Sequence, residues 1–489
     1  MVIVVGAGAT GLGIAWDLVL QGIPVTVIEQ GDIGYGTSGR FHGLLHSGAR
    51  YVVTDPVAAH DCFRENLILK RIAGQAIENT GGYFIQTDVK DNDYRERWEA
   101  GMQQAGIRYR PVTIDALRRD IGFELVAQSA YYVPDAVLEG FRLLQLLKEN
   151  ILAHGGHILT ATRVTAIDTQ GGHVNNVHIE GPTGVQQLAC DVVVNAGGPW
   201  AGTISQMFDD PVSMQLSYGL MVIFANRHLN KVLNRLREPG VGDIFVPHRN
   251  VVILGTTDVA VEEPTPRYPD IRETLRLLQL GREMVPAIER WRVLRAFTGV
   301  RPLYGKKSSI TVTRQVSRDF TIVNHAKERG PSGAFSVLGG KWTTFRLMAE
   351  RCVDQVCDYL GVQRFCKTAL VPLISDHPPT LTDEHDAVLC ECEQVHSREL
   401  QDIRDSIDIW RTKTWFAMGP CQGTFCGHRV MAVRQQRNPQ ENIATTLQNL
   451  RKEREKGMQA AAIGANARQL ALQRAVRFQT LNEPYTPIG

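Results

Sequence analysis

The amino-terminal segment carries the feature that most restricts the fold of this chain, a glycine-rich loop between two apolar runs. The run "VIVV" at residues 2–5 leads directly into "GAGATGLG" at 6–13, an amphipathic stretch follows, and "PVTVIE" ends at Glu29. Apolar runs of this length, separated by a segment of helical periodicity, predict a strand, a helix and a second strand. Such a βαβ unit predicts a parallel, Rossmann-type sheet and an α/β fold.

The three glycines of the loop have separate tasks in nucleotide binding. Gly6 permits a tight turn, Gly8 lets the backbone approach a pyrophosphate, and Gly11 allows close packing of the helix on the strand. The helix that follows can direct free N–H groups at the phosphates. Glu29 lies 23 residues after Gly6 and can accept hydrogen bonds from ribose hydroxyls. A dinucleotide site is therefore predicted at this end of the chain.

The loop does not distinguish FAD from NAD, but two later segments favour FAD. The stretch "TSGRFHGLLHSGARY" at 37–51 supplies glycines, hydroxyls and a histidine where a flavin ring could lie along the backbone. In "GGKWTTFRLMAE", two glycines precede a helix whose positive end can stabilise a reduced flavin. The predicted cofactor-binding residues are Gly6, Gly8, Ala9, Gly11, Glu29, Gln30, Thr37, Ser38, Leu44, His46, Val164, Gly197, Trp200, Gly339, Gly340 and Thr343.

The length of 489 residues predicts several domains. Strand-like runs that end in glycines recur at 191–198 and 333–350, whereas β-branched runs between them are typical of a mixed sheet. We expect an oxidoreductase domain over 1–368, with nucleotide-binding segments at about 1–60, 145–210 and 325–365 and substrate-domain segments at about 61–144 and 211–324. A proline-rich linker (369–386), a cysteine domain (387–440) and a basic helical tail (441–489) are expected to follow.

Composition excludes several classes of protein. A formal net charge of +2 gives no general affinity for nucleic acid. The first apolar run leaves no room for a signal peptide, and no apolar stretch approaches the roughly 18 residues of a membrane span. A cytoplasmic protein is expected, in which clustered cysteines are metal ligands or redox groups rather than disulfides.

Four of the nine cysteines are clustered, Cys390 and Cys392 as C-x-C and Cys421 and Cys426 as C-x4-C. Structural zinc sites favour the spacing of the second pair but not that of the first. Four cysteines also suit a 2Fe-2S cluster. The spacing favours iron-sulfur, with zinc or an unmetallated quartet as alternatives. The scattered cysteines are predicted to be buried thiols, namely Cys62, Cys190, Cys352, Cys357 and Cys366.

The last part of the chain is rich in basic residues. Between Arg429 and Arg477 it carries ten lysines and arginines against three acidic residues. This run predicts either the solvated faces of terminal helices or a docking surface for an acidic partner or a membrane-bound complex.

Taken together, "VVGAGATGLGIA", "TSGRFHGLLHSGARYVVTD", "ENLILKRIA", "ILGTTD", "FTGVRPL", "VSRDF" and "GGKWTTFRLMAE" resemble the flavin-dependent glycerol-3-phosphate dehydrogenases. The segments "LCECE" and "GPCQGTFC" narrow the resemblance to the large subunit of the anaerobic, three-subunit type. The resemblance implies an α/β (α+β overall) fold. Its parts are a Rossmann-type FAD-binding domain of the D-amino-acid-oxidase-like class with an inserted mixed β-sheet substrate domain, and a small, mostly helical 2Fe-2S domain. The stretch before "LCEC" is shorter than the usual linker of the family, which leaves the placement of that domain open.

The resemblance also implies a function. The reaction is oxidation of sn-glycerol 3-phosphate to dihydroxyacetone phosphate, with electrons passing through the cluster to companion subunits, one of them membrane-associated, and to the quinone pool of anaerobic respiration. The protein would then lie at the inner face of the membrane through its partners. By position, the implied substrate-binding residues are Arg50, Tyr51, Arg301, Arg318, Lys341 and Thr344. Several cations suit a phosphomonoester, which carries nearly two negative charges.

The chemistry requires a general base, because a secondary alcohol must lose its hydroxyl proton as hydride leaves C2. A histidine with a pKa near 7 does this best. His46 is the candidate, a structural role for it stays open, and His42 and His248 are the second and third choices. Lys341 and Arg301 complete the predicted catalytic set. Alternatives are another polyol phosphate, a hydroxy or amino acid substrate, and a non-catalytic electron-transfer component.

Overall fold

A computed structural model of the chain describes residues 1–265, 267–304, 319–363, 365–375, 386–400 and 406–479. Its amino-terminal sheet has six strands in the order β20-β21-β13-β1-β2-β9, and only β20 runs antiparallel to its neighbour. Every residue of β1, β2 and β13 is buried, as expected for parallel strands covered on both faces. The strands are β1 (Val2–Val5), β2 (Val25–Ile28), β9 (His157–Leu159), β13 (Val192–Asn195), β20 (Phe320–Asn324) and β21 (Ala334–Gly339).

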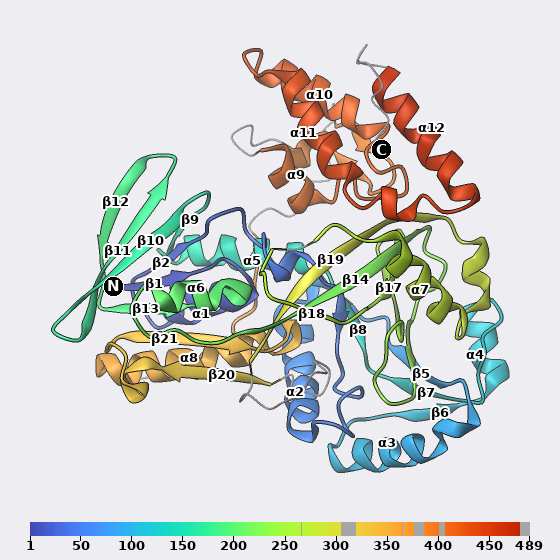
Figure 1. Cartoon of the computed structure of the whole chain (residues 1–489), viewed down its shortest axis with the longest axis horizontal. Coiled ribbons are helices and arrows are strands. Elements are labelled where there is room, and N and C mark those ends of the chain that lie inside the picture. The colour runs from blue at the N-terminus through green and yellow to red at the C-terminus, as the bar shows by residue number, and fades with distance from the viewer. Residues whose placement is uncertain (266, 305–318, 364, 376–385, 401–405, 480–489) are drawn as a thin grey trace.

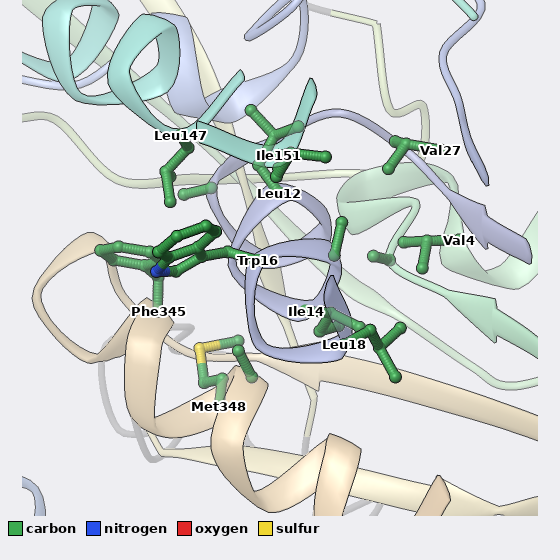
Figure 2. Close-up of a cluster of buried hydrophobic side chains, with 14 of the residues drawn as sticks. Val4, Leu12, Ile14, Trp16, Leu18, Val27, Leu147, Ile151, Phe345 and Met348 are labelled. Carbon is green, nitrogen blue, oxygen red and sulfur yellow. The ribbon is translucent and has the colours of Figure 1, made fainter. Parts of the chain in front are cut away.

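The helix of the predicted βαβ unit is α1 (Ala9–Leu20), and it lies in the middle of the largest core. Figure 2 shows its side chains between Leu147 and Ile151 of α5 (Gly140–Ala153) on one side and Phe345 and Met348 of α8 (Phe345–Leu360) on the other. A β-carbon built on Gly13 would lie 2.9 Å from the Phe345 ring. The small residue thus lets α8 approach α1 closely, and the predicted Rossmann-type fold is confirmed.

A second sheet has nine strands, and β5 and β15 are parallel within an otherwise antiparallel arrangement. It is the predicted mixed sheet, and its long central pair is β14 (Gln215–Ala225) and β19 (Val293–Leu303). The other strands are β5 (Gly82–Gln86), β6 (Arg110–Val112), β7 (Ser129–Val133), β15 (Val232–Arg235), β16 (Ile244–His248), β17 (Val251–Gly255) and β18 (Val259–Val261). The helices nearby in Figure 1 are α2 (Pro56–Ile72), α3 (Asn92–Gln104), α4 (Ile114–Ile121) and α7 (Ile271–Arg282).

Smaller elements complete the oxidoreductase part. The strands β10 (Arg163–Gln170), β11 (His173–Gly181) and β12 (Gly184–Ala189) form an antiparallel sheet that projects from one end of the molecule (Figure 1). The short strands β3 (Leu44–Leu45), β4 (Ile77–Glu78) and β8 (Ala136–Leu138) form another sheet, and α6 (Ala201–Gln206) follows β13. The strand β20 pairs with β21 in the first sheet. Its residues, expected in the substrate segment 211–324, therefore lie on the nucleotide-binding side.

The cysteine segment is small and mostly helical, as predicted. It contains a two-stranded sheet, β22 (Val388–Cys390) with β23 (Val395–His396), and the helices α9 (Ile407–Thr414), α10 (Cys426–Arg437), α11 (Ile443–Glu455) and α12 (Ala465–Gln479). Its core contains Trp410, Phe416, Leu447 and Leu450 together with the buried cysteines. These helices lie together at one end of the molecule, beside β19 and α7 (Figure 1).

The basic tail belongs to this segment rather than extending from it. Three of its arginines are buried, Arg434, Arg451 and Arg454. The Arg434 guanidinium donates to Glu441 at 2.9 Å, and that of Arg454 to Gln422 at 2.7 Å. Because they are buried, these three arginines belong neither to a solvated helix face nor to an exposed docking surface. No helix in the part of the chain that the structure describes has the length and apolarity to cross a membrane.

We predict that Gly11→Ala disrupts the nucleotide loop. A β-carbon there would lie 1.9 Å from the carbonyl oxygen of Gly6, and backbone atoms in a buried sheet have little room to move. Overpacking of this kind costs on the order of 2 kcal/mol or more. Urea unfolding midpoints and the FAD absorbance per chain should both fall. The matched control is Gly74→Ala, where nothing lies within 4 Å of the added methyl. Full FAD content and an unchanged midpoint in Gly11→Ala would contradict the packing role.

Candidate active site

A cavity of about 890 Å³ is lined by residues of both large sheets. On one side are the loop after β1 and the end of β2, and on the other are residues of β14 and β19. Every predicted cofactor-binding residue except Gly11 lines it. Gly11 lies beneath the loop, against the Gly6 carbonyl, which is the packing task assigned to the third glycine.

The nucleotide end of the cavity is shaped by hydrogen bonds to its own loop. The Glu29 carboxylate accepts from the N–H groups of Ala7 at 2.9 Å and Gly31 at 2.8 Å. Burial raises the pKa of Glu29, while these two bonds oppose that effect. The Ser38 hydroxyl oxygen accepts from the Ala9 N–H at 2.9 Å. The loop is thus held in place, and Glu29 still reaches the cavity wall.

The other end of the cavity is formed by the two segments that the sequence analysis expected to contact a flavin. The Trp342 ring N–H donates to the Ser38 carbonyl at 3.0 Å, and the His46 N–H donates to the Thr343 hydroxyl at 3.2 Å. Gly339 and Gly340 have φ angles of +78° and +84°, which side chains rarely adopt. A short 3-10 turn at Trp342–Thr344 follows, and α8 begins after it. Segments about 300 residues apart therefore meet at one wall, with a helix start directed at the cavity.

His42 is neutral and presents a donor. Its Nδ1 accepts the Leu44 N–H at 3.1 Å, so its own proton is on Nε2. Burial, together with the charges of Arg301 and Arg50, lowers the pKa of His42 to about 3. A histidine whose lone pair is engaged and whose pKa is this low can polarise an oxygen but is a poor general base.

His46 lies in a cluster of groups suited to proton transfer. Its ring centroid is 5.3 Å from that of Tyr51 and 5.9 Å from that of His42. The Lys341 ammonium lies 4.7 Å from the centre of the Tyr51 ring. The Asn66 amide donates to the His46 carbonyl at 3.2 Å, which fixes the backbone. These four side chains, His42, His46, Tyr51 and Lys341, all line the cavity.

His248, the third candidate base, is outside the cavity. It does not belong to the lining residues, and its ring centroid lies 4.7 Å from that of Trp415 in the cysteine segment. Burial lowers its pKa to about 4. It is therefore not positioned to act on a substrate.

The cations of the cavity differ in how far their charge is neutralised. Arg50 and Arg237 share the buried carboxylate of Asp243, at 3.2 and 2.8 Å. Arg301 is paired with Asp258 at 3.3 Å. Among the described residues, Lys341 forms no ion pair with a carboxylate. Lys341 and the two arginines that share one carboxylate are therefore less neutralised than Arg301 is.

One predicted substrate residue is absent from the cavity lining, and another lies outside the described residues. Thr344 is 2% exposed, and its hydroxyl donates to the Lys341 carbonyl at 3.3 Å. It is not a lining residue of the cavity, and its hydroxyl braces the turn that carries Lys341, so the expected substrate contact stays a prediction. Arg318 lies outside the described residues.

The four clustered cysteines lie in mutual contact. Cys390 is hydrogen-bonded to Cys426, and Cys421 to both Cys392 and Cys426. Contact with neighbouring thiols lowers the pKa of Cys390 and Cys421 and raises the pKa of Cys392 and Cys426. In the described ranges, no three or more His, Cys, Asp or Glu side chains are arranged to hold a metal ion.

A two-iron cluster requires two thiolates on each iron. The sulfur contacts bring Cys390 to Cys426 and Cys392 to Cys421. Backbone N–H groups also reach the sulfurs, from Ala417 and Glu393 to Cys390 and from Gly423 and Phe425 to Cys421. Such donors tune the potential of iron-sulfur centres. The four thiols and these N–H donors are therefore of the kind that a 2Fe-2S cluster needs, although their side chains are not arranged around a metal position in the described ranges.

Residues 1–346 match the model of the protein family described as FAD dependent oxidoreductase. The chain belongs to this family. A subunit of the anaerobic glycerol-3-phosphate dehydrogenase of Haloferax volcanii is 34% identical to it over 99% of this chain and 91% of the relative. A subunit of the enzyme of that name from Escherichia coli K12 is 34% identical over 97% of this chain and 95% of the relative.

Solved structures of low identity share the fold. The glycerol-3-phosphate dehydrogenase of Bacillus halodurans complexed with FAD has a TM-score of 0.56 and 18% identity, covering 98% of this chain and 89% of that one. The L-proline dehydrogenase of P. horikoshii has a TM-score of 0.59 and 17% identity, covering 76% and 96%. Both confirm the fold class that the sequence predicted.

This FAD-dependent oxidoreductase also has cavity residues that the sequence reasoning missed. Thr256 and Asp258 follow β17 directly and hold the Arg301 guanidinium, with the Thr256 hydroxyl at 2.5 Å. Asp55 caps α2 by accepting the Ala58 N–H at 3.1 Å, and it also lines the cavity. Polar residues directly after an apolar strand were the available signal for the first pair.

The low pKa of His248 predicts a pH-dependent stability term. The unfolded histidine protonates below its usual pKa of 6.5, whereas the folded one stays neutral to about 4, so stability is lost as the pH falls through this window. From pH 6.5 to 5 the loss is about 2 kcal/mol.

Burial raises the pKa of the carboxylates Glu29 and Asp135, so they stabilise the fold as the pH falls, opposite to His248. The contribution of His248 is therefore obtained as the difference in unfolding free energy between wild type and a His248 variant. In urea unfolding, the free-energy gap between wild type and His248→Gln should shift by this amount in favour of the variant on acidification. A gap that is constant with pH would contradict a neutral, buried His248.

Proposed function

We propose that this protein oxidises sn-glycerol 3-phosphate to dihydroxyacetone phosphate with FAD as the electron acceptor. The observation that carries the proposal is the group formed by His46, Tyr51 and Lys341 on the wall of the FAD cavity. It joins a candidate proton acceptor to a cation that forms no ion pair with any carboxylate in the described part of the chain. The two relatives at 34% identity, both named as parts of an anaerobic glycerol-3-phosphate dehydrogenase, support the same substrate.

Bound FAD supplies the hydride acceptor, and the residues of the chain prepare the alcohol for it. Lys341 and Arg50 hold the phosphate, because Lys341 has no ion pair with a carboxylate among the described residues and Arg50 shares a single carboxylate with Arg237. His46 takes the hydroxyl proton as hydride leaves the adjacent carbon. The Nε2–H of His42 donates a hydrogen bond to the developing carbonyl oxygen, and its low pKa keeps it neutral while it does so.

We propose further that electrons leave through a 2Fe-2S cluster held by Cys390, Cys392, Cys421 and Cys426. The mutual contacts of the four thiols and the N–H groups beside them support this ligand set. From there, electrons would pass to companion subunits, one of them membrane-associated, and to the quinone pool. The protein would then work at the cytoplasmic face of the membrane through these partners.

The substrate prediction is tested by anaerobic titration of the flavin absorbance. We expect sn-glycerol 3-phosphate to bleach the flavin of the wild type, and Lys341→Gln to raise the half-saturating concentration at least about tenfold. Loss of a charged hydrogen bond to phosphate costs about 1.4 kcal/mol or more, which is a factor of ten. The matched control is Lys90→Gln, a surface lysine whose side chain is 69% exposed.

Other outcomes distinguish the alternatives. Bleaching by a different polyol phosphate alone would change the substrate within the same class. Bleaching by a hydroxy or amino acid, with no effect of Lys341→Gln, would contradict the phosphate site. A flavin that no such substrate reduces would leave only an electron-transfer role.

The cluster is tested by elemental analysis. We expect about two iron atoms and two acid-labile sulfides per wild-type chain, and loss of most of both in Cys421→Ser, since each iron needs its two thiolates. Cys366→Ser provides the control, because that thiol lies outside the quartet. Zinc in place of iron, or equal iron in both variants, would overturn the assignment.

A further inference from the structure

The tip of the hairpin between β16 and β17 contacts the cysteine segment. The Arg249 Nε donates to a Glu393 carboxylate oxygen at 2.8 Å, and its Nη2 donates to the Glu393 carbonyl at 3.3 Å. The neighbouring Asn250 side-chain amide donates to the Cys392 carbonyl. One turn of the substrate-domain sheet therefore holds both the second cysteine of the C-x-C pair and the residue after it.

Arg249 is bound from both parts of the molecule. Its Nη1 donates to Glu139 at 3.1 Å, just before α5, while Glu393 belongs to the cysteine segment. Glu393 is almost completely buried, with a side chain 3% exposed. A buried carboxylate is costly unless it is paired, so the contact with Arg249 contributes to holding the two parts together. Arg249 has a φ of +49°, a conformation that few non-glycine residues adopt.

Beside this contact, Trp415 fills the space between the cysteine segment and the cavity wall. Its ring centroid lies 4.7 Å from that of His248 and 5.7 Å from that of Phe141. The His248 ring in turn packs on Gly43, where a β-carbon would lie 2.7 Å from it. The Phe141 ring packs on Gly39, where the corresponding distance is 3.0 Å. Both glycines belong to the segment 37–51 that forms the flavin wall.

We propose that Arg249 is a positioning residue for electron transfer within the chain. It holds the loop of Cys392 at one place relative to the flavin wall, with Trp415 packed between the two. The inference rests on the proposed function, in which each transfer oxidises the reduced flavin by one electron and reduces the cluster by one. Two transfers would restore oxidised FAD and release the one proton that arrived with the hydride, while the hydroxyl proton leaves from His46. A one-electron acceptor such as ferricyanide would reoxidise the cluster after each transfer.

The test uses full-length holoprotein and the variant Arg249→Asn. Asparagine adopts the left-handed backbone more readily than most residues, so this change removes the guanidinium without adding backbone strain. Arg249→Lys retains the positive charge, so its hydrogen exchange and electron-transfer rate should lie between those of Arg249→Asn and those of the wild type. Arg282→Asn is the control, because that arginine forms an exposed surface pair with Glu289 at 2.6 Å.

Two measurements are made on each variant. Amide hydrogen exchange over residues 388–396 should be at least about tenfold faster in Arg249→Asn, since a factor of ten corresponds to about 1.4 kcal/mol of opening free energy. In anaerobic rapid mixing with ferricyanide as acceptor, the rate of flavin reduction by sn-glycerol 3-phosphate should be unchanged. Electron transfer from flavin to cluster should be slower by at least about tenfold, the size of effect that small displacements of reacting groups can produce.

The outcomes separate this inference from the function on which it rests. Unchanged exchange and an unchanged transfer rate in Arg249→Asn would overturn the inference. Faster exchange with an unchanged transfer rate would reduce Arg249 to a structural contact and would also overturn it. If sn-glycerol 3-phosphate fails to reduce the wild-type flavin, the proposed function is wrong, and photoreduction of the flavin then replaces the substrate so that the transfer rate is still measured.

Discussion

The contact between Gly11 and the carbonyl oxygen of Gly6 is the constraint on which the rest of the structure depends. Because neither residue has a β-carbon, α1 starts directly at the end of β1, and its first residues line the cavity. The same closeness repeats where Gly13 meets the Phe345 ring, which draws α8 onto α1. The segment before α8 places Gly339, Gly340 and Lys341 at the cavity. The close packing of α8 on α1 therefore also positions these site residues.

The site owes its chemistry to unequal electrostatic environments. The cations differ in their partners: Arg301 is paired with a carboxylate, whereas Lys341 is not paired with one among the residues that the structure describes. The Nδ1 of His42 already accepts a hydrogen bond. Charge neutralisation decides which cation can bind an anion, and the hydrogen bond to Nδ1 decides which histidine can act as a base. An apolar cavity wall strengthens each of these differences, since the local dielectric is low.

The cysteine segment is joined to the oxidoreductase part by two kinds of contact. Met458, Ala460, Ala461 and Leu470 pack into the core of the second sheet, while the four-cysteine core has polar and aromatic contacts to the oxidoreductase part through Arg249, Glu393 and Trp415. Directional contacts of this kind determine where a segment sits more strictly than apolar contact does, because hydrogen bonds weaken steeply when their geometry changes. The basic residues of the tail serve the same segment, with Arg434 and Arg454 bound inside it.

The sequence by itself determined the βαβ unit, the FAD loop, the mixed second sheet and the cysteine quartet. These depend on local periodicity, on glycines at fixed spacing and on residue type, all of which can be read along the chain. Only the tertiary structure decided that Thr344 points away from the cavity, that His248 faces Trp415 and that β20 joins the first sheet. It also decided which cations are neutralised, because Asp243 and Asp258 lie about 190 and 40 residues from the arginines that they bind. Ion pairs between residues this far apart depend on how the chain packs, and local sequence patterns do not predict them.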